Sequence, residues 1–238
     1  MDGLDSLSTR SGVPAPLVGE TSKRVYVSSI DRLRELPGLF RGSDLTMRHG
    51  WNSKTASHYL WLWKKSGLAM PLGGHSDVFA NLVVDPDPNW EAALLMARPS
   101  AVIVGIKCLQ RAGWTTQIVT RPDVVIDSSL PVFRSNHFDV QRRSVDWFAA
   151  ASRGLTRNGF GSAPAIKPAW ALADMLQRSG WAGCGLAPND IDWDVHQDSD
   201  HREWQRALRA LGMPKQELKA PEVAESEVVQ PTQIERCR

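Results

Sequence analysis

The chain has 238 residues, 42% of them hydrophobic and 23% charged, values that are ordinary for globular proteins and argue against a disordered chain. This length predicts two domains. With 28 basic and 26 acidic residues the net charge is only +2, so a strongly basic surface requires an uneven distribution of charge along the chain.

The cysteine content and hydropathy predict a cytoplasmic protein. Cys108, Cys184 and Cys237 show no paired spacing, which argues against a disulfide framework and a zinc finger. No N-terminal apolar segment typical of a signal peptide is present, and no apolar run approaches the length of a membrane span. We therefore expect a soluble chain that does not bind a membrane.

The first segments of the chain predict an arm and a supporting helix. Residues 1–22 are polar and rich in Ser, Gly and Pro, and we expect them to form a flexible arm. Residues 28–36 predict a helix that ends before a proline, with Ile30 and Leu33 facing inward.

Two further helices are expected on either side of a turn at Gly50. The first has Ser43 as its N-cap and Leu45 as its main inward residue. The second starts after Asn52, whose side-chain oxygen can accept a hydrogen bond from a free backbone N–H of the first turn. Its apolar residues recur at i, i+3, i+4 and i+7, which is one face of a helix: Ala56, Tyr59, Leu60 and Trp63.

The next segment predicts a two-stranded wing. Residues 68–72 and 78–80 read as strands, and Gly73-Gly74 is typical of a hairpin. Together these elements predict a winged helix–turn–helix over residues 23–85, a module that places its second helix in the DNA major groove. The face of that helix opposite the apolar one carries Lys54, Thr55, Ser57, His58 and Trp61. Its polar residues, the last turn of the helix and the neighbouring basic residues supply the candidate DNA contacts: Lys54, Thr55, Ser57, His58, Lys64, Lys65, Arg41 and Arg48.

The charge distribution favours this interpretation. Residues 23–65 contain nine basic and three acidic residues and carry +6, and because the whole chain carries +2, the remainder carries −4. Basic charge concentrated on one module is typical of phosphate binding. The alternative is a small helical subdomain used for dimerisation or for a protein partner.

Residues 90–213 predict a larger, mixed α+β domain, after a connection marked by Pro86 and Pro88. Its entry reads as a pair of helices, and its end as two helices followed by a disordered tail. The expected helices are residues 90–98, 103–112, 169–179 and 202–211, and the expected strands are residues 116–120, 123–126 and 131–138. Residues 140–148 read as a strand that leads into a helix, and residues 153–168 read as a loop. The expected tail is residues 214–238.

The order of these motifs resembles the AbiEi family of antitoxins from type IV toxin–antitoxin systems, which act in abortive infection as a phage defence. The resemblance covers residues 25–212 and rests mainly on residues 99–114, PSAVIVGIKCLQRAGW, and residues 168–176, PAWALADML. It implies an N-terminal winged domain that binds inverted repeats in its own promoter and represses transcription. It also implies a C-terminal domain that counters a nucleotidyltransferase toxin without forming a stable complex.

The resemblance points to the same second helix as the DNA-binding element. It assigns DNA contacts to Lys54, Thr55, Ser57 and His58, and in the wing it leaves His75 as the one candidate for a phosphate contact. A monomer in solution that binds double-stranded DNA cooperatively is compatible with it.

An acidic stretch, residues 189–203, raises the alternative of a metal-dependent nucleic-acid-processing enzyme. Asp190 and Asp192 alternate, as in sites that hold Mg²⁺ for nucleotidyl transfer. The other interpretation is a solvated loop that caps the last helix through Ser199 or Asp200. No GxSxG, P-loop or HExxH motif occurs. We expect no catalytic residue, metal or cofactor, and the remaining alternative is a winged-helix regulator with a ligand-sensing or dimerisation domain.

A second surface for anionic ligands is a further candidate in the larger domain, against the alternative of an ordinary charged surface. It would consist of Arg142, Arg143, Arg153, Arg157 and Lys167.

Overall fold

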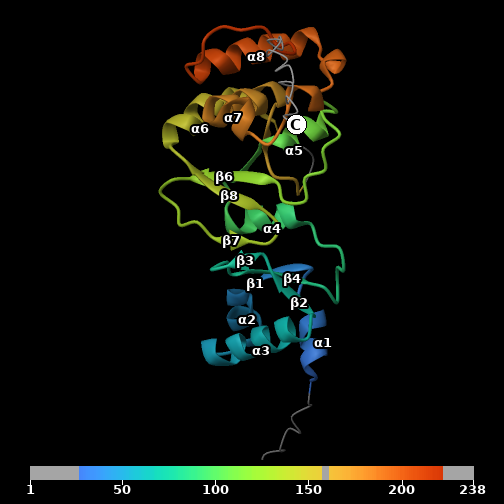
Figure 1. Ribbon diagram of the computed structural model, residues 1–238. Coiled ribbons are helices and arrows are strands. Elements are labelled where there is room, and N and C mark those ends of the chain that lie inside the picture. Colours follow the sequence, from blue (N-terminus) through green and yellow to red (C-terminus); the bar gives the residue numbers. More distant parts are fainter. Residues whose placement is uncertain (1–26, 157–160, 222–238) are drawn as a thin grey trace, which may run out of the picture.

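The computed structural model describes residues 27–156 and 161–221. The expected arm and Arg157 lie outside these residues, as does the last part of the expected tail from residue 222. Helices and strands are interspersed along the chain in a mixed α+β arrangement. Figure 1 shows an N-terminal region, in blue and cyan, stacked beneath a larger C-terminal region.

The N-terminal region combines three helices with a three-stranded sheet. The sheet has the order β1-β4-β2, and both pairings are antiparallel. Its elements are α1 (Ser29–Arg34), β1 (Leu39–Arg41), α2 (Gly42–His49), α3 (Ser53–Lys65), β2 (Ala69–Pro71), β3 (Gly73–Gly74) and β4 (Val78–Asn81).

The turn between α2 and α3 has the expected local chemistry, with one correction. Gly50 adopts a left-handed conformation with φ 62°, and the side chain of Asn52 accepts a 2.8 Å hydrogen bond from the Thr55 N–H. Ser43, however, is not the N-cap of α2. That helix begins after Arg41, whose N–H donates to the Asp44 side chain, while the Ser43 hydroxyl donates to Asp77 at 3.0 Å.

The core of the N-terminal region lies between the three helices and the sheet. Leu33, Leu45 and Trp63 are fully buried in it, as expected for inward residues. Ile30 is 37% exposed, so its expected inward position is wrong; α1 is only six residues long, and of the two expected residues it buries only Leu33. Inside the core, the buried Asn81 amide donates to two carbonyl oxygens of the α1 region and fixes that helix on the sheet.

The C-terminal region contains a five-stranded mixed sheet of order β8-β6-β5-β10-β9. In Figure 1, α6 and α7 lie above this sheet, α8 lies beyond α7, and α4 lies below it, toward the N-terminal region. Its elements are α4 (Trp90–Ala97), β5 (Val102–Val104), α5 (Ile106–Arg111), β6 (Asp123–Asp127), β7 (Arg134–Ser135), β8 (Asp139–Arg143), α6 (Val145–Ala151), β9 (Leu155–Thr156), β10 (Ala165–Ile166), α7 (Pro168–Gly183) and α8 (Asp198–Ala210), with short 3-10 turns at Ser152–Gly154, Pro188–Asp190 and Trp193–Val195.

The entry of this region differs from the expected helix pair. Val102, Ile103 and Val104 form the central strand β5, which pairs with β6 on one side and with β10 on the other. Three consecutive β-branched residues that are all buried suit a strand covered on both faces. The helix is therefore shorter than expected and begins only after Gly105.

Other expected elements are also corrected. Residues 116–120 form no strand, the expected strand at 131–138 is reduced to β7, and the expected loop at 153–168 contains β9 and β10. The strands β6 and β8 and the helix α7 lie where they were predicted. The helix α7 extends further than expected, past a kink at Gly180 to Gly183.

The end of the described chain is also packed, in contrast to the expected tail. The Trp204 indole N–H donates to the Gln216 carbonyl oxygen at 2.9 Å, and Leu218 is buried in the main core. Disorder from residue 214 is therefore wrong for residues 214–221. The predicted N-cap of α8, Ser199 or Asp200, is also wrong. The helix begins after Gln197, whose N–H donates to the Asp200 carboxylate.

The hairpin of the N-terminal region is docked on the C-terminal region. A tight hairpin turn was expected at Gly73 and Gly74, and this prediction is wrong. The two residues extend as β3 and pair antiparallel with β7. The chain reverses after them, and Leu72 and Val78 belong to the buried cluster of the C-terminal region. The two regions therefore share a core at this hairpin. In Figure 1, β3 lies beside β7.

Candidate nucleic-acid interface

The exposed face of α3 gathers cations and small polar groups. Lys54, Ser57 and His58 are exposed, Thr55 is half-buried, and Lys64 and Lys65 are exposed in the last turn. No acidic residue occurs between Ser53 and Lys65. A face of this composition can bind phosphates and base edges, and nothing on the helix itself repels a nucleic acid.

The opposite face of α3 is held by packing. Ala56 and Trp63 are buried, and the Trp63 indole N–H donates to the Ser29 hydroxyl at 2.7 Å. The Tyr59 ring stacks on Trp51 with centroids 4.4 Å apart, so the turn before α3 also contacts the helix. Because this side is fixed, the exposed side chains project from a rigid platform.

An aromatic side chain stands among the cations. Trp61 is 56% exposed, although tryptophan is usually buried at least in part. The His58 ring stacks on its indole with centroids 6.3 Å apart, and the Lys65 ammonium lies 5.0 Å from its centroid. Trp61 therefore occupies the middle of the exposed face. Its sequence position on that face was evident, but its degree of exposure was not.

The two arginines among the candidate DNA contacts, Arg48 and Arg41, have different surroundings. Arg48 is exposed in the last turn of α2. The guanidinium of Arg41 donates to the carbonyl oxygen of Met96, at the end of α4. Arg41 therefore ties the N-terminal region to the C-terminal one.

His75 also lies at this junction. It is exposed, and its backbone adopts φ 64°, a left-handed conformation that is uncommon for a residue other than glycine. It borders a hollow of about 150 Å³ between the hairpin and the α4 region, whose other lining residues are Arg41, Ser76, Asp77, Val78, Ala97, Arg98 and Phe133. The structure therefore places His75 beside the C-terminal region.

The basic surface for anionic ligands that was expected in the C-terminal region is not assembled as one group. Arg143 forms an ion pair with the buried Asp174 at 3.3 Å, and Lys167 pairs with Glu203 at 3.1 Å. Both side chains are thus engaged within the fold. Arg142 and Arg153 are exposed, and Arg153 borders a groove with Arg206 and Arg209, while Arg157 lies outside the described residues.

Three of the aspartates in residues 189–203, Asp190, Asp192 and Asp200, accept hydrogen bonds from nearby backbone N–H groups. The Asp190 carboxylate accepts from the Gln117 amide at 3.0 Å and from the Ala187 N–H at 2.7 Å, and Asp192 accepts from the Asp194 N–H. Among the residues that the structure describes, no three His, Cys, Asp or Glu side chains are grouped so that they could hold a metal ion. The alternating carboxylates are therefore not brought together around one point.

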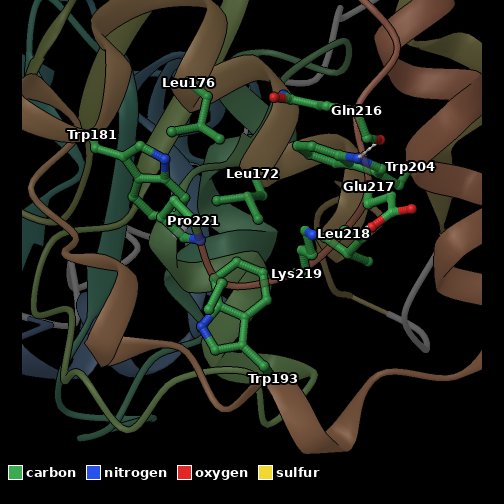
Figure 2. Close-up of a pocket in the computed structure, with 11 residues that line it drawn as sticks. Leu172, Leu176, Trp181, Trp193, Trp204, Gln216, Glu217, Leu218, Lys219 and Pro221 are labelled. Atoms are coloured by element: carbon green, nitrogen blue, oxygen red, sulfur yellow. Dashed lines mark hydrogen bonds and ion pairs between the residues drawn. The ribbon is translucent and has the colours of Figure 1, made fainter. Parts of the chain in front are cut away.

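A cavity lined by indoles lies in the C-terminal region and was not anticipated from the sequence. Figure 2 shows Trp181, Trp193 and Trp204 around it, with Leu172 and the segment from Gln216 to Pro221 closing its sides. Its volume is about 170 Å³. The chain has ten tryptophans, and the sequence carries no signal that three of them converge here.

The comparisons with known proteins add little to this geometry. No protein-family model matches the chain, and no curated protein matches it. Among solved structures, the chain is similar to the RV2827C protein from Mycobacterium tuberculosis, with a TM-score of 0.46 and 16% sequence identity over 78% of this chain and 76% of that chain. A likeness of this degree assigns no function. Across the described ranges, no helix has the length and apolar character that crossing a membrane requires.

Proposed function

We propose that the chain is a DNA-binding antitoxin of the AbiEi type that acts in the cytoplasm. Its N-terminal region would bind inverted repeats in its own promoter as a winged helix–turn–helix and repress transcription. Its C-terminal region would counter a nucleotidyltransferase toxin without a stable complex. The observation that carries the DNA-binding part is the exposed face of α3, which bears Lys54, Ser57, His58, Lys64 and Lys65 and no acid.

The order of elements supports a winged helix–turn–helix. A supporting helix, an edge strand, two helices joined at Gly50 and a β2–β4 hairpin follow one another, and the sheet order is β1-β4-β2. In such a module the second helix of the pair enters the major groove. Here that helix is α3, and its buried side is anchored through Ala56 and Trp63.

The position of the hairpin changes the expected contacts. Because β3 is paired with β7, the tip of the wing faces the C-terminal region. We therefore assign DNA contact to α3 and to Arg48 of α2, and we assign Arg41 and His75 to the junction. The antitoxin role of the C-terminal region rests on the sequence resemblance at residues 99–114 and 168–176.

A second candidate function is a winged-helix regulator with a ligand-sensing domain. The cavity lined by Trp181, Trp193 and Trp204 favours it, since concave, mostly apolar sites with a few polar groups are typical of small-molecule binding. The two candidates share the DNA-binding region and differ in what the C-terminal region does.

Two experiments test the proposal with the full chain. The first is a gel-shift titration with the DNA upstream of its own gene and a shuffled DNA of equal length. We expect preferential binding of the upstream DNA by the wild type and by Lys215→Ala, an exposed residue of the C-terminal region. Equal or absent binding of the two DNAs would overturn the DNA-binding part.

The second experiment is co-expression with the product of the neighbouring gene, which this proposal expects to be a nucleotidyltransferase. We expect the chain to restore growth, and we expect the pair not to co-purify. Growth rescue should persist in Lys54→Ala, because neutralisation is assigned to the C-terminal region. Absence of rescue, together with DNA binding that changes on addition of a small molecule, would favour the ligand-sensing regulator.

A further inference from the structure

Trp61 exposes an apolar side chain on the face of α3 that otherwise carries polar and basic residues. Its indole is 56% exposed, whereas Trp63, two residues later on the same helix, is fully buried. Packing of the fold therefore does not require a tryptophan at this position. An exposed indole of this size needs an explanation in what the face contacts.

The neighbours of Trp61 define the kind of partner. Lys54, His58, Trp61 and Lys65 follow one another at spacings of four, three and four residues, which places them on one stripe of the helix. The Lys65 ammonium lies over the indole, and the His58 ring stacks on it. The partner must therefore offer anionic groups on both sides of an apolar one.

The major groove of DNA offers this combination. Phosphates line its edges, and within it the one apolar group on a base edge is the C5-methyl of thymine. The helix rises 1.5 Å per residue, so Lys54 and Trp61 are separated by roughly 10 Å along the axis, or about three base pairs. One helix can then hold a phosphate with a lysine while its tryptophan reaches a base edge.

We infer that Trp61 is a specificity-determining residue that contacts thymine C5-methyl groups in the major groove. The inference rests on the proposed DNA-binding function and adds the chemical group that the site recognises. Lys54, Lys64 and Lys65 supply phosphate contacts that are independent of sequence, and the indole supplies apolar contact that depends on thymine.

Replacement of thymine by uracil tests this directly, because it removes only the methyl group from the base. The upstream DNA is amplified with dTTP or with dUTP in its place, and full-length protein is titrated against both. We expect wild-type binding to weaken by about fourfold for each methyl group that the indole buries. In Trp61→Ala the ratio of the two affinities should fall to about one.

Matched variants separate this contact from other effects. Lys54→Ala should weaken binding to both DNAs and keep the thymine-to-uracil ratio of the wild type. Trp61→Phe, which retains a smaller aromatic ring, should keep part of the ratio. Circular dichroism and thermal melting of each variant check that α3 remains folded.

The possible failures are distinguishable. Preferential binding of the upstream DNA that is equally strong with thymine and uracil would overturn this inference alone. A ratio that persists in Trp61→Ala would also overturn it, since the methyl effect would then come from another residue or from DNA shape. A change of oligomeric state in Trp61→Ala would show that the indole contacts protein. Absence of binding to either DNA would overturn the proposed function and this inference with it.

Discussion

The hydroxyl of Ser135 donates a 2.7 Å hydrogen bond to the carbonyl oxygen of Leu72, and the bond is buried. Ser135 belongs to β7 of the C-terminal region, and Leu72 lies in the hairpin that follows α3. The same hydroxyl oxygen accepts from the His137 N–H at 3.1 Å. One side chain thus satisfies two backbone groups where the two regions meet.

Loss of this hydroxyl should weaken the junction. Ser135→Ala leaves the buried Leu72 carbonyl and the His137 N–H without this partner, and we expect a loss of about 1–3 kcal/mol in the free energy of unfolding. Urea denaturation measures it. Ser128→Ala, at an exposed serine of the same region, is the control and should change stability by less than about 0.5 kcal/mol.

The adjacent glycines test the β3–β7 pairing. A Cβ on Gly73 would lie 2.0 Å from the Arg134 carbonyl oxygen, whereas on Gly74 the nearest heavy atom would be 4.0 Å away. We expect Gly73→Ala to cost about 1–3 kcal/mol, because the strands must separate, and Gly74→Ala to be nearly neutral. Thermal denaturation compares the two. Equal effects of the two substitutions would contradict the docked hairpin.

Arg142 and Arg143 are neighbours in β8 with different roles. Arg143 pairs with Asp174, which is 2% exposed and also accepts a 2.8 Å hydrogen bond from the Trp147 indole. Arg143→Ala leaves Arg178, 3.4 Å away, as the remaining ion-pair partner of that carboxylate, and we expect it to cost about 1–3 kcal/mol. Arg142→Ala, at an exposed position, should be nearly neutral. If Arg143→Ala were stable and bound polyanions more weakly than the wild type, the interpretation of these residues as a surface for anionic ligands would be restored.

His196 predicts a loss of stability in mild acid. Burial lowers the pKa of His196, and the opposing Asp200 and Asp192 carboxylates do not offset it. Its ring lies 4.0 Å from the Trp114 centroid. Because the unfolded chain has the ordinary histidine pKa of about 6.5, it binds more protons than the folded one near this pH. The contribution of neutral His196 to the free energy of unfolding is therefore complete above the pKa of the unfolded chain, and it is lost as the pH falls through the pKa of the folded chain.

The variant His196→Phe isolates this effect. It retains an aromatic ring against Trp114 and Trp193 and removes the titrating group. Unfolding free energies of the wild type and the variant are compared at about pH 7.5 and about pH 5.5. We expect the difference between the two pH values to be smaller in the variant. An identical pH dependence would show that His196 is not charged more readily in the unfolded chain.

Local chemistry made much of the N-terminal region predictable. Asn52 as the cap of α3, Gly50 as the end of α2 and the buried face with Ala56 and Trp63 follow from residue type and spacing, and all are confirmed. The exposed face of the helix followed from the same spacing. Its contact with DNA stays a prediction.

Features set by distant partners were not predictable in this way. Gly73-Gly74 has the composition of a hairpin turn, but pairing with β7 some sixty residues later extends it. Ile103 and Val104 fit a helical pattern as well as a strand, and β6 and β10 on either side decide the outcome. Arg143 looked like surface charge because Asp174 lies far from it in sequence.

A salt titration of DNA binding is the measurement we would make first. Affinity for the upstream DNA is measured by fluorescence anisotropy at several salt concentrations for the wild type, Lys54→Ala and Lys215→Ala. We expect a steep fall of affinity with salt in the wild type, a slope smaller by about 0.9 in Lys54→Ala, and no change in Lys215→Ala. Identical slopes in all three proteins, or affinity that does not depend on salt, would show that α3 does not face DNA.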